Sequence, residues 1–202
     1  MSTEIYIPQN SITLDQQTIA QIRLGIQGAP GEGKTFAAMT FPNPVVVNFD
    51  RGLGAHIGRK DIIEIPFHNP GFVDSITKRN KPTDPPNKRD AFIKWLETEG
   101  FKLTNNQTLV VDASTGLEAA FESQQNLEPV VTRDGFHDTY AFWRAKIDYF
   151  NQVTDIFFSL NCHVIYIAHE QDERTKKGDY TGKVKPLLTG QFADKLVSKF
   201  TD

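Results

Sequence analysis

The stretch "GAPGEGKT" at residues 28–35 decides the fold class of this chain. It matches the phosphate-binding template G-x-x-x-x-G-K-[ST] at every fixed position, which are Gly28, Gly33, Lys34 and Thr35. The apolar run "IRLGIQ" precedes it and the helix-like run "FAAMT" follows it. A strand, a glycine-rich turn and a helix in this order let successive backbone N–H groups converge on an anion. The stretch therefore predicts a loop that holds nucleotide phosphates.

Two side chains of this loop have predicted contacts with the ligand. Lys34 is expected to reach the β- and γ-phosphates of ATP, and the Thr35 hydroxyl is expected to ligate Mg²⁺. The predicted nucleotide-binding set is the whole loop with the residue that follows it: Gly28, Ala29, Pro30, Gly31, Glu32, Gly33, Lys34, Thr35 and Phe36.

Length, charge and cysteine usage restrict the class of protein. The 202 residues fit one domain, and the net charge of −3 excludes a globally basic nucleic-acid coat. Cys162 is the only cysteine, so no intramolecular disulfide and no thiol cluster can form. The N-terminus has no basic segment before an apolar core, and no apolar run approaches the ~18 residues of a membrane span. These features predict a cytoplasmic protein.

The pattern along the chain predicts an α/β fold with a mainly parallel central sheet flanked by helices. Five nearly continuous apolar runs read as strands buried on both faces, at 22–27, 45–49, 62–67, 108–113 and 163–168. Helices are expected from Gly33 to before Pro42, over 88–100, and over 138–160. Residues of the last helix at spacings of three and four predict a stripe facing the sheet: Tyr140, Trp143, Ile147, Phe150, Val153, Phe157 and Leu160. Long loops are expected at 77–89, 124–137 and 171–188.

Asp112 is the predicted carboxylate of the Mg²⁺ site. It ends the run "TLVVDAS", and a nucleotide triphosphate site needs an acid at the end of an apolar strand that neighbours the phosphate loop. The alternative is that Asp112 caps the helix that begins in "ASTGLEAAF".

Asp50 is the predicted base that orients the attacking water, because it follows the run "VVVNF" directly. Glu118 and Glu122 on the next helix are rival bases. In the alternative reading, Asp50 begins a turn with "RGLG".

With "GAPGEGKT", "VVVNFDRGLGAH", "TLVVDAST" and "VIYIAHE", the chain resembles the RecA-like P-loop ATPases. Within them it is similar to the small AAA-type nucleotide-binding ATPases of phages, in the single-strand-annealing and recombination group. The resemblance implies a RecA-like ATPase core at residues 21–202 behind an extension at 1–20, with a C-terminal end that looks truncated. It also places a catalytic acid at Asp50, shortly before Leu53, although the family commonly has glutamate there.

The same resemblance implies a sensor of the γ-phosphate at His169, on the strand between the phosphate-loop strand and the Mg²⁺-site strand. The segment after it, 171–188, corresponds to the family's loop for single-stranded DNA. Its candidate DNA-binding residues are Arg174, Lys176, Lys177, Tyr180, Lys183 and Lys185. Lysines can pair with phosphates and a tyrosine ring can stack on a base. Residues 124–137, with Arg133, correspond to the first DNA-contacting loop.

The expected function is a Mg²⁺-dependent, DNA-stimulated ATPase that couples ATP to single-stranded DNA binding in phage-type homologous recombination or single-strand annealing. Expected partners are single-stranded DNA, further copies of the chain in a ring or filament, and a single-stranded-DNA-binding protein, in the host cytoplasm if the chain is phage-encoded. Two alternatives stay open: a P-loop kinase for a small acceptor, and a nucleotide-dependent adaptor with negligible turnover.

Overall fold

The computed structural model describes residues 21–78, 86–127, 129, 131–136, 138–175 and 178–188. The first half of the chain forms β1 (Arg23–Gly28), α1 (Lys34–Ala38), β2 (Pro44–Asn48), the 3₁₀ turn η2 (Gly52–His56), β3 (Ile63–Pro66) and α2 (Pro70–Thr77). The second half forms α3 (Lys88–Thr98), η3 (Gly100–Lys102), β4 (Thr108–Asp112), α4 (Ser114–Leu127), α5 (Thr139–Ser159), β5 (His163–Arg174) and β6 (Tyr180–Pro186).

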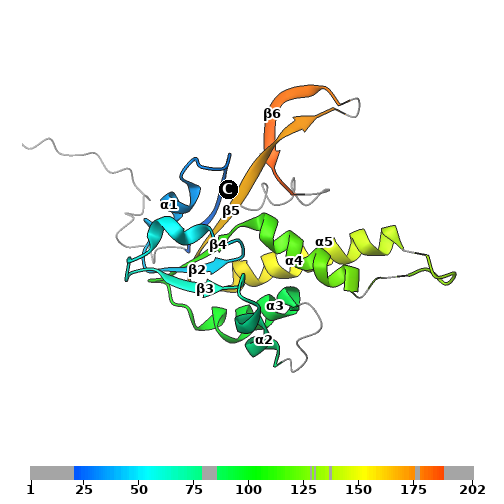
Figure 1. Cartoon of the computed structure of the whole chain (residues 1–202). Helices are drawn as coiled ribbons and strands as arrows, with labels where there is room; N and C mark the ends of the chain where they lie inside the picture. Colours follow the sequence, from blue (N-terminus) through cyan, green and yellow to red (C-terminus); the bar gives the residue numbers. More distant parts are fainter. Residues whose placement is uncertain are drawn as a thin grey trace, which may run out of the picture.

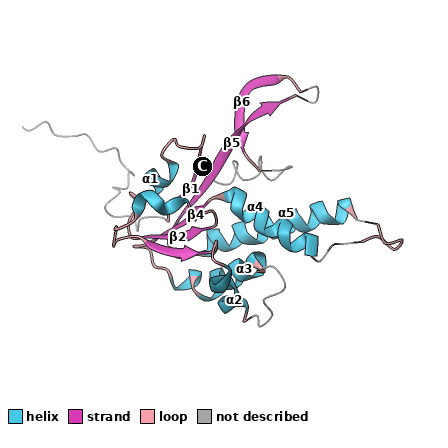
Figure 2. Cartoon of the chain, in the orientation of Figure 1, coloured by secondary structure: helices cyan, strands magenta, loops and turns pink. Residues whose placement is uncertain are grey.

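The strands form one sheet in the order β1-β5-β4-β2-β3, and β6 pairs with the far part of β5. The five strands of the main path are parallel, whereas β6 is antiparallel to β5. The predicted α/β architecture with a parallel central sheet is therefore confirmed. Figures 1 and 2 show the β5–β6 hairpin projecting away from the sheet and from the helices that cover it.

Both faces of the sheet are buried along β2, β4 and the first part of β5, whereas the edge strands β1 and β3 are partly exposed. The buried residues divide between the two faces with a period of two. Val45 and Val47 belong to the larger core, which contains residues of α3, α4 and α5, whereas Val46 belongs to a smaller core with Ala38 and Met39. The same alternation holds in β4 and β5. Because successive side chains point to opposite faces, a strand covered on both sides must be apolar throughout. This is why these strands were predictable.

Helices α2, α3 and α5 begin at polar residues whose side chains accept a backbone N–H. Asn69 accepts from the N–H of Gly71, with Pro70 at the first helical position, and Asp138 accepts from the N–H of Ala141. Helix α4 approaches β2 closely, because a β-carbon at Gly116 would lie 2.4 Å from the Cβ of Phe49. The first turn of α4, which begins at Ser114, therefore packs against the residue that follows β2.

The structure corrects several predicted boundaries. The segment 171–188 is largely strand: Gln171–Arg174 extend β5, and β6 follows as its antiparallel partner. Helix α4 continues to Leu127, so 124–127 is not loop. Helix α2 was not predicted, and the turn η2 corresponds to the alternative in which Asp50 begins a turn with "RGLG". Residues 79–85 of the expected loop at 77–89, and the extension at 1–20, lie outside the described residues.

The stripe predicted on α5 is only partly buried. Phe150, Val153, Phe157 and Leu160 are in the core, but Tyr140 is 78% exposed. Trp143 is also exposed, since the first turns of α5 extend past the sheet beside α4 (Figure 1). Within the described part of the chain, no helix is both long and apolar enough to cross a bilayer.

Candidate nucleotide site

The carboxyl ends of the parallel strands bring the predicted site residues together. Gly28 at the end of β1 is in register with His169 on β5, and Asp112 at the end of β4 is in register with Asn48 at the end of β2. Strand β5 lies between β1 and β4, the position expected for the strand that carries His169. Ligands of open α/β sheets bind at this edge.

Lys34 is buried inside the phosphate loop. Its side chain is on the first residue of α1, and its ammonium donates hydrogen bonds to the carbonyl oxygens of Gly28 (2.8 Å) and Ala29 (2.6 Å). Gly31 and Gly33 have φ values of 86° and 78°, which side chains rarely adopt. The glycines of the motif thus give the loop its path around the lysine.

Thr35 and Asp112 form the predicted metal pair. The Thr35 hydroxyl donates to Asp112 Oδ2 at 2.9 Å, which joins the phosphate loop to the end of β4. Asp112 is 4% exposed and the Asp112–Ala113 peptide bond is cis. The carboxylate thus accepts from the loop that would hold the phosphates.

The pKa of Asp112 depends on its burial and on the other predicted catalytic residues. Burial raises the pKa of Asp112 above its usual range, and the nearby charge of Asp50 adds to the rise. The hydrogen bond from Thr35 and the charges of His169 and Lys34 oppose it. A carboxyl group whose pKa is set by burial and several charged neighbours at one sheet edge is typical of a functional site.

Asp50 lies in the exposed loop after β2, rather than at the end of the strand as predicted. Its Oδ1 accepts the N–H of Gly52 at 3.0 Å. A β-carbon at position 52 would lie 3.0 Å from this oxygen and 3.9 Å from Asp112 Oδ2, so a larger residue would crowd the Asp50 carboxylate. Gly52 therefore lies next to both carboxylates, which are side by side on the same edge.

Asn48 positions this loop and was missed in the sequence. It is 1% exposed, and its Oδ1 accepts the N–H groups of Asp50 (3.3 Å) and Arg51 (3.0 Å). Its amide nitrogen donates to Glu64 on β3 at 2.7 Å. The sequence did contain a signal for Asn48, since it is a polar residue that directly follows the apolar run "VVV".

The rival bases Glu118 and Glu122 are held elsewhere. Both accept hydrogen-bonded ion pairs from Lys146 of α5, whose ammonium lies 2.5 Å from Glu118 Oε1 and 2.7 Å from Glu122 Oε1. Lys146 is 2% exposed and its ammonium lies 5.1 Å from the Trp143 ring centroid. These ion pairs join α4 to α5 and engage both carboxylates with Lys146.

His169 presents an unsatisfied ring nitrogen beside the phosphate loop. Its Nδ1 is buried and has no hydrogen-bond partner within the residues that the structure describes. Buried polar atoms are nearly always paired, so an orphaned one indicates a ligand or an ordered water. Phe36, the last residue of the predicted nucleotide-binding set, is exposed, unlike the buried nitrogen of His169. Its ring is 65% exposed and stacks on the His56 ring, with centroids 6.3 Å apart.

The residues at this edge fit ATP with Mg²⁺. A hydroxyl and a carboxylate suit Mg²⁺, which takes few protein ligands and completes its shell with phosphate oxygens and water. Within the described ranges, no group of three or more His, Cys, Asp or Glu could hold a metal by itself. Thr35 and Asp112 would hold the ion and Lys34 the phosphates, and the ion would neutralise charge that develops on the phosphates.

The described DNA-binding candidates lie along the projecting hairpin. Lys183 and Lys185 are on β6, where the register with β5 shifts between Asp172 and Arg174. Tyr180 pairs across the strands with Arg174, whose guanidinium donates to the Gly178 carbonyl. Lys176 and Lys177 lie outside the described residues.

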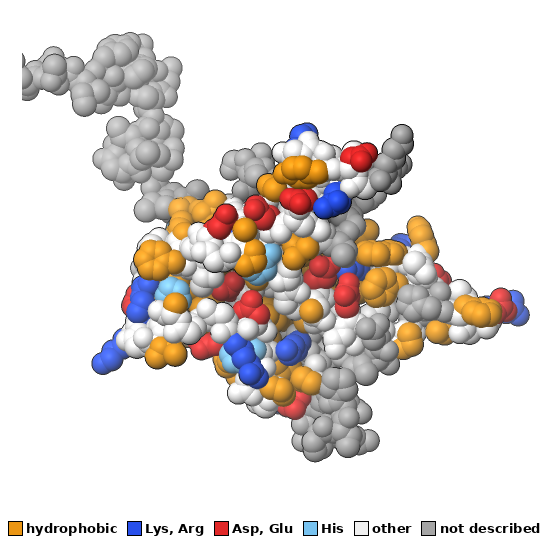
Figure 3. Space-filling model, turned by 45° about the horizontal axis from the view of Figure 1, so that its top comes forward, with side chains coloured by type: hydrophobic (Ala, Val, Ile, Leu, Met, Phe, Trp, Pro, Cys, Tyr) orange, Lys and Arg blue, Asp and Glu red, His pale blue; other side chains and the backbone are white. Residues whose placement is uncertain are grey.

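The hairpin is of mixed character. Tyr180 and Val184 are 56% and 48% exposed, and acids such as Asp172 and Glu173 stand among the basic residues. Figure 3 shows both charges and hydrophobic side chains interspersed over this region. Basic, acidic and apolar side chains are therefore mixed along the hairpin.

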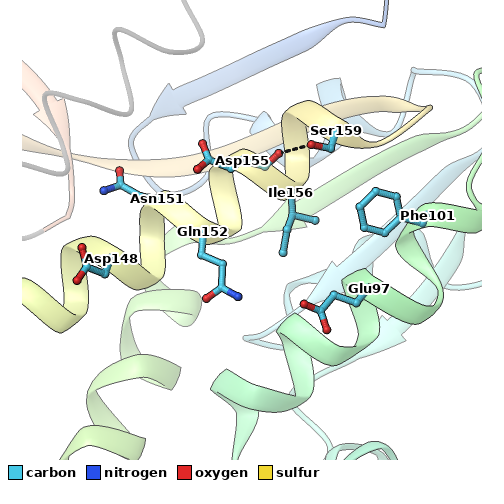
Figure 4. Close-up of a pocket in the computed structure, with 8 residues that line it drawn as sticks. All are labelled: Glu97, Phe101, Asp148, Asn151, Gln152, Asp155, Ile156 and Ser159. Carbon is cyan, nitrogen blue, oxygen red and sulfur yellow. Dashed lines mark hydrogen bonds between the residues drawn. The ribbon is translucent and has the colours of Figure 1, made fainter.

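Two open hollows on the covering helices contain none of the predicted site residues. One, of about 470 Å³, lies between α5 and the α3–η3 segment, with Glu97, Phe101 and Ile156 among its lining residues (Figure 4). The other, of about 950 Å³, adjoins it and shares Glu97, Asp148 and Gln152. The nucleotide site is thus assigned from the sheet edge and the phosphate loop, not from these hollows.

Comparison with known proteins agrees with this geometry. A family model described as an AAA domain matches residues 20–201, a range that includes the phosphate loop, Asp112 and the β5–β6 hairpin. No match was found among curated proteins.

Proposed function

The chain belongs to the AAA domain family, and we propose that this member is a Mg²⁺-dependent ATPase that couples its nucleotide state to binding of single-stranded DNA. Family membership supports nucleotide binding and ATPase chemistry. The DNA-linked part of the proposal, and a role in homologous recombination or single-strand annealing as in phages, goes beyond the family.

One observation carries the coupling: the strand that bears His169 is the strand that forms the hairpin. β5 passes His169, beside Gly28, and continues without a break in the strand to Arg174. The N–H of Leu187, just after β6, donates to the His169 carbonyl at 2.6 Å. Both ends of the hairpin are therefore attached at the residue nearest to the phosphate loop.

In this mechanism the chain's own residues have separate tasks. The loop N–H groups and Lys34 bind the phosphates, and Asp112 orients Thr35 toward the metal position. Asp50 would accept the proton of the attacking water, in a position fixed by Asn48. His169 would bond the terminal phosphate when it is present, which satisfies its orphaned Nδ1.

An ATPase assay with and without oligo(dT) tests the proposal directly. We expect slow hydrolysis alone, a several-fold rise with oligo(dT), and loss of both with Lys34→Ala. Lys102→Ala, which removes an exposed lysine paired with Glu99, is the matched control and should behave as the parent protein. Hydrolysis only with a small acceptor would select the kinase. Nucleotide binding with no turnover and no DNA retention would select the adaptor.

The proposal extends to assembly. We expect copies of the chain to form a ring or filament on DNA, together with a single-stranded-DNA-binding protein as a further partner. Sedimentation in ATPγS, Mg²⁺ and oligo(dT) measures this, and a species of one chain under all conditions would contradict it.

A further inference from the structure

The phosphate loop contains a tight turn at residues 29–32. Pro30 occupies its second position and Gly31, with φ of 86°, its third. The N–H of Glu32 donates to the Ala29 carbonyl at 3.3 Å. Proline followed by a residue of positive φ is the signature of a type II turn. The loop is therefore built on a defined turn before its phosphate-binding part begins.

The side chain of Glu32 returns to the residue at which this turn begins. The N–H of Ala29 donates to Glu32 Oε2 at 2.8 Å, so Ala29 and Glu32 are joined by two reciprocal bonds. A β-carbon at Gly28 would lie 2.5 Å from the same oxygen. Glycine at position 28 thus leaves the space that the carboxylate occupies.

Lys34 also holds this part of the loop. Its ammonium donates to the carbonyls of Gly28 and Ala29. An ammonium has three donors, and each donor that turns from these carbonyls to phosphate oxygens weakens this hold. The bonds between Ala29 and Glu32 do not involve the ammonium, so they close the turn whichever way Lys34 points.

The charge of Glu32 has two opposing effects. A carboxylate repels phosphates, yet Glu32 is exposed, and water and salt screen such repulsion. A hydrogen bond from an N–H to a carboxylate is stronger than one between neutral groups. The balance favours the closing of the turn over the repulsion.

We propose that Glu32 is a positioning residue for the nucleotide: its carboxylate keeps the 29–32 turn closed while Lys34 engages the phosphates. This inference rests on the proposed nucleotide binding. In this role Glu32 differs from the backbone N–H groups of the loop, because its side chain binds Ala29 and does not contact the nucleotide.

The experiment is calorimetric titration of Mg²⁺–ATPγS into the parent protein, Glu32→Gln and Glu32→Ala. Glutamine keeps an acceptor oxygen without the charge, whereas alanine removes both. We expect Glu32→Ala to bind about three- to tenfold more weakly, the range of one hydrogen bond, and Glu32→Gln to stay within about twofold of the parent. Glu99→Ala, at an exposed glutamate far along the chain, is the control, and thermal unfolding without nucleotide should be alike in all four.

Two results would overturn the inference. Binding by Glu32→Ala as tight as that of the parent would show that the turn needs no carboxylate. Tighter binding by both variants would show that the carboxylate competes with phosphate. If the parent protein itself binds no ATPγS, the proposed function fails first, and this failure differs from either result. Amide exchange at Ala29 in the nucleotide complex, fast in Glu32→Ala and slow in Glu32→Gln, reports the turn independently of affinity.

Discussion

The hydroxyl of Thr35 and the carboxylate of Asp112 are joined by a 2.9 Å hydrogen bond, although the residues are 77 positions apart in the sequence. This bond closes the candidate site, because it connects the phosphate loop to a strand two places away in the sheet. Loss of a partner that orients a metal ligand typically lowers metal affinity or activity by about 10–100-fold.

Asp112→Asn should therefore impair the use of Mg²⁺. We expect the metal concentration for half-maximal ATP hydrolysis to rise, or kcat to fall, by about 10–100-fold. ATP binding measured in EDTA should be nearly unchanged, since Lys34 and the loop remain. Hydrolysis with the Mg²⁺ dependence of the parent protein would remove Asp112 from the metal site.

The raised pKa of Asp112 predicts a pH dependence of stability. Because the folded-state pKa is above the unfolded value, the folded protein binds the proton more tightly, and stability falls as pH rises through the folded pKa. Without nucleotide and metal, Asp112→Asn should be more stable than the parent at neutral pH. The difference should vanish as pH falls to the usual carboxyl pKa of 3.8, which urea unfolding across pH would measure.

Asp50→Asn should lower hydrolysis while sparing binding. Loss of a general base costs about 10²-fold or more in kcat, and ATP affinity should stay within about twofold. Glu118→Gln is the comparison, because Lys146 holds that carboxylate in the structure. Its folded fraction should hydrolyse ATP as the parent does. Normal turnover by Asp50→Asn would contradict the assignment.

Lys146→Met should destabilise the fold strongly. It leaves Glu118, which is 8% exposed, without its cation, and removing one partner of a buried ion pair costs about 3–5 kcal/mol. Adding Glu118→Gln should restore part of the loss. Urea unfolding measures both, with exposed Lys94→Met as the control. A loss below about 1 kcal/mol would show that the cluster is solvated in solution.

The lysines and the tyrosine of the hairpin give separable predictions for DNA binding. Lys183→Ala with Lys185→Ala should reduce the salt slope of oligo(dT) binding by about 1.4, at ~0.7 for each phosphate contact. Tyr180→Ala should weaken binding by about 1–3 kcal/mol with the slope unchanged, if its ring stacks on a base. Fluorescence anisotropy over a salt series measures both. Unchanged binding in both variants would leave the hairpin with no DNA role.

The sequence predicted the parts of the fold in which local pattern and burial agree. The strands β2 and β4 are covered on both faces, so "VVV" and "TLVV" had only one reading. β6 has exposed residues on both faces, and "YTGKVKP" therefore has no apolar pattern to find. The start of α2 did have a signal, since Asn69 and Pro70 are a favoured cap and first residue.

The site was predictable in its residue types and less so in its contacts. The ends of apolar strands located Gly28, Asp112 and His169, because parallel strands end at one edge. The bonds of Glu32 to Ala29 and of Asn48 to the Asp50 backbone depend on the path of the loops. The path of these loops cannot be derived from the spacing of residues in the sequence. Likewise, only packing of α5 on α4 shows that Lys146 engages Glu118 and Glu122.

The length of β5 has a spatial consequence. From His169 to Arg174 the strand extends about 17 Å at ~3.4 Å per residue, and β6 doubles it along this reach. The outer residues of the hairpin, Arg174 and Tyr180, are therefore held well away from the candidate nucleotide site, although they belong to the same strand pair as His169.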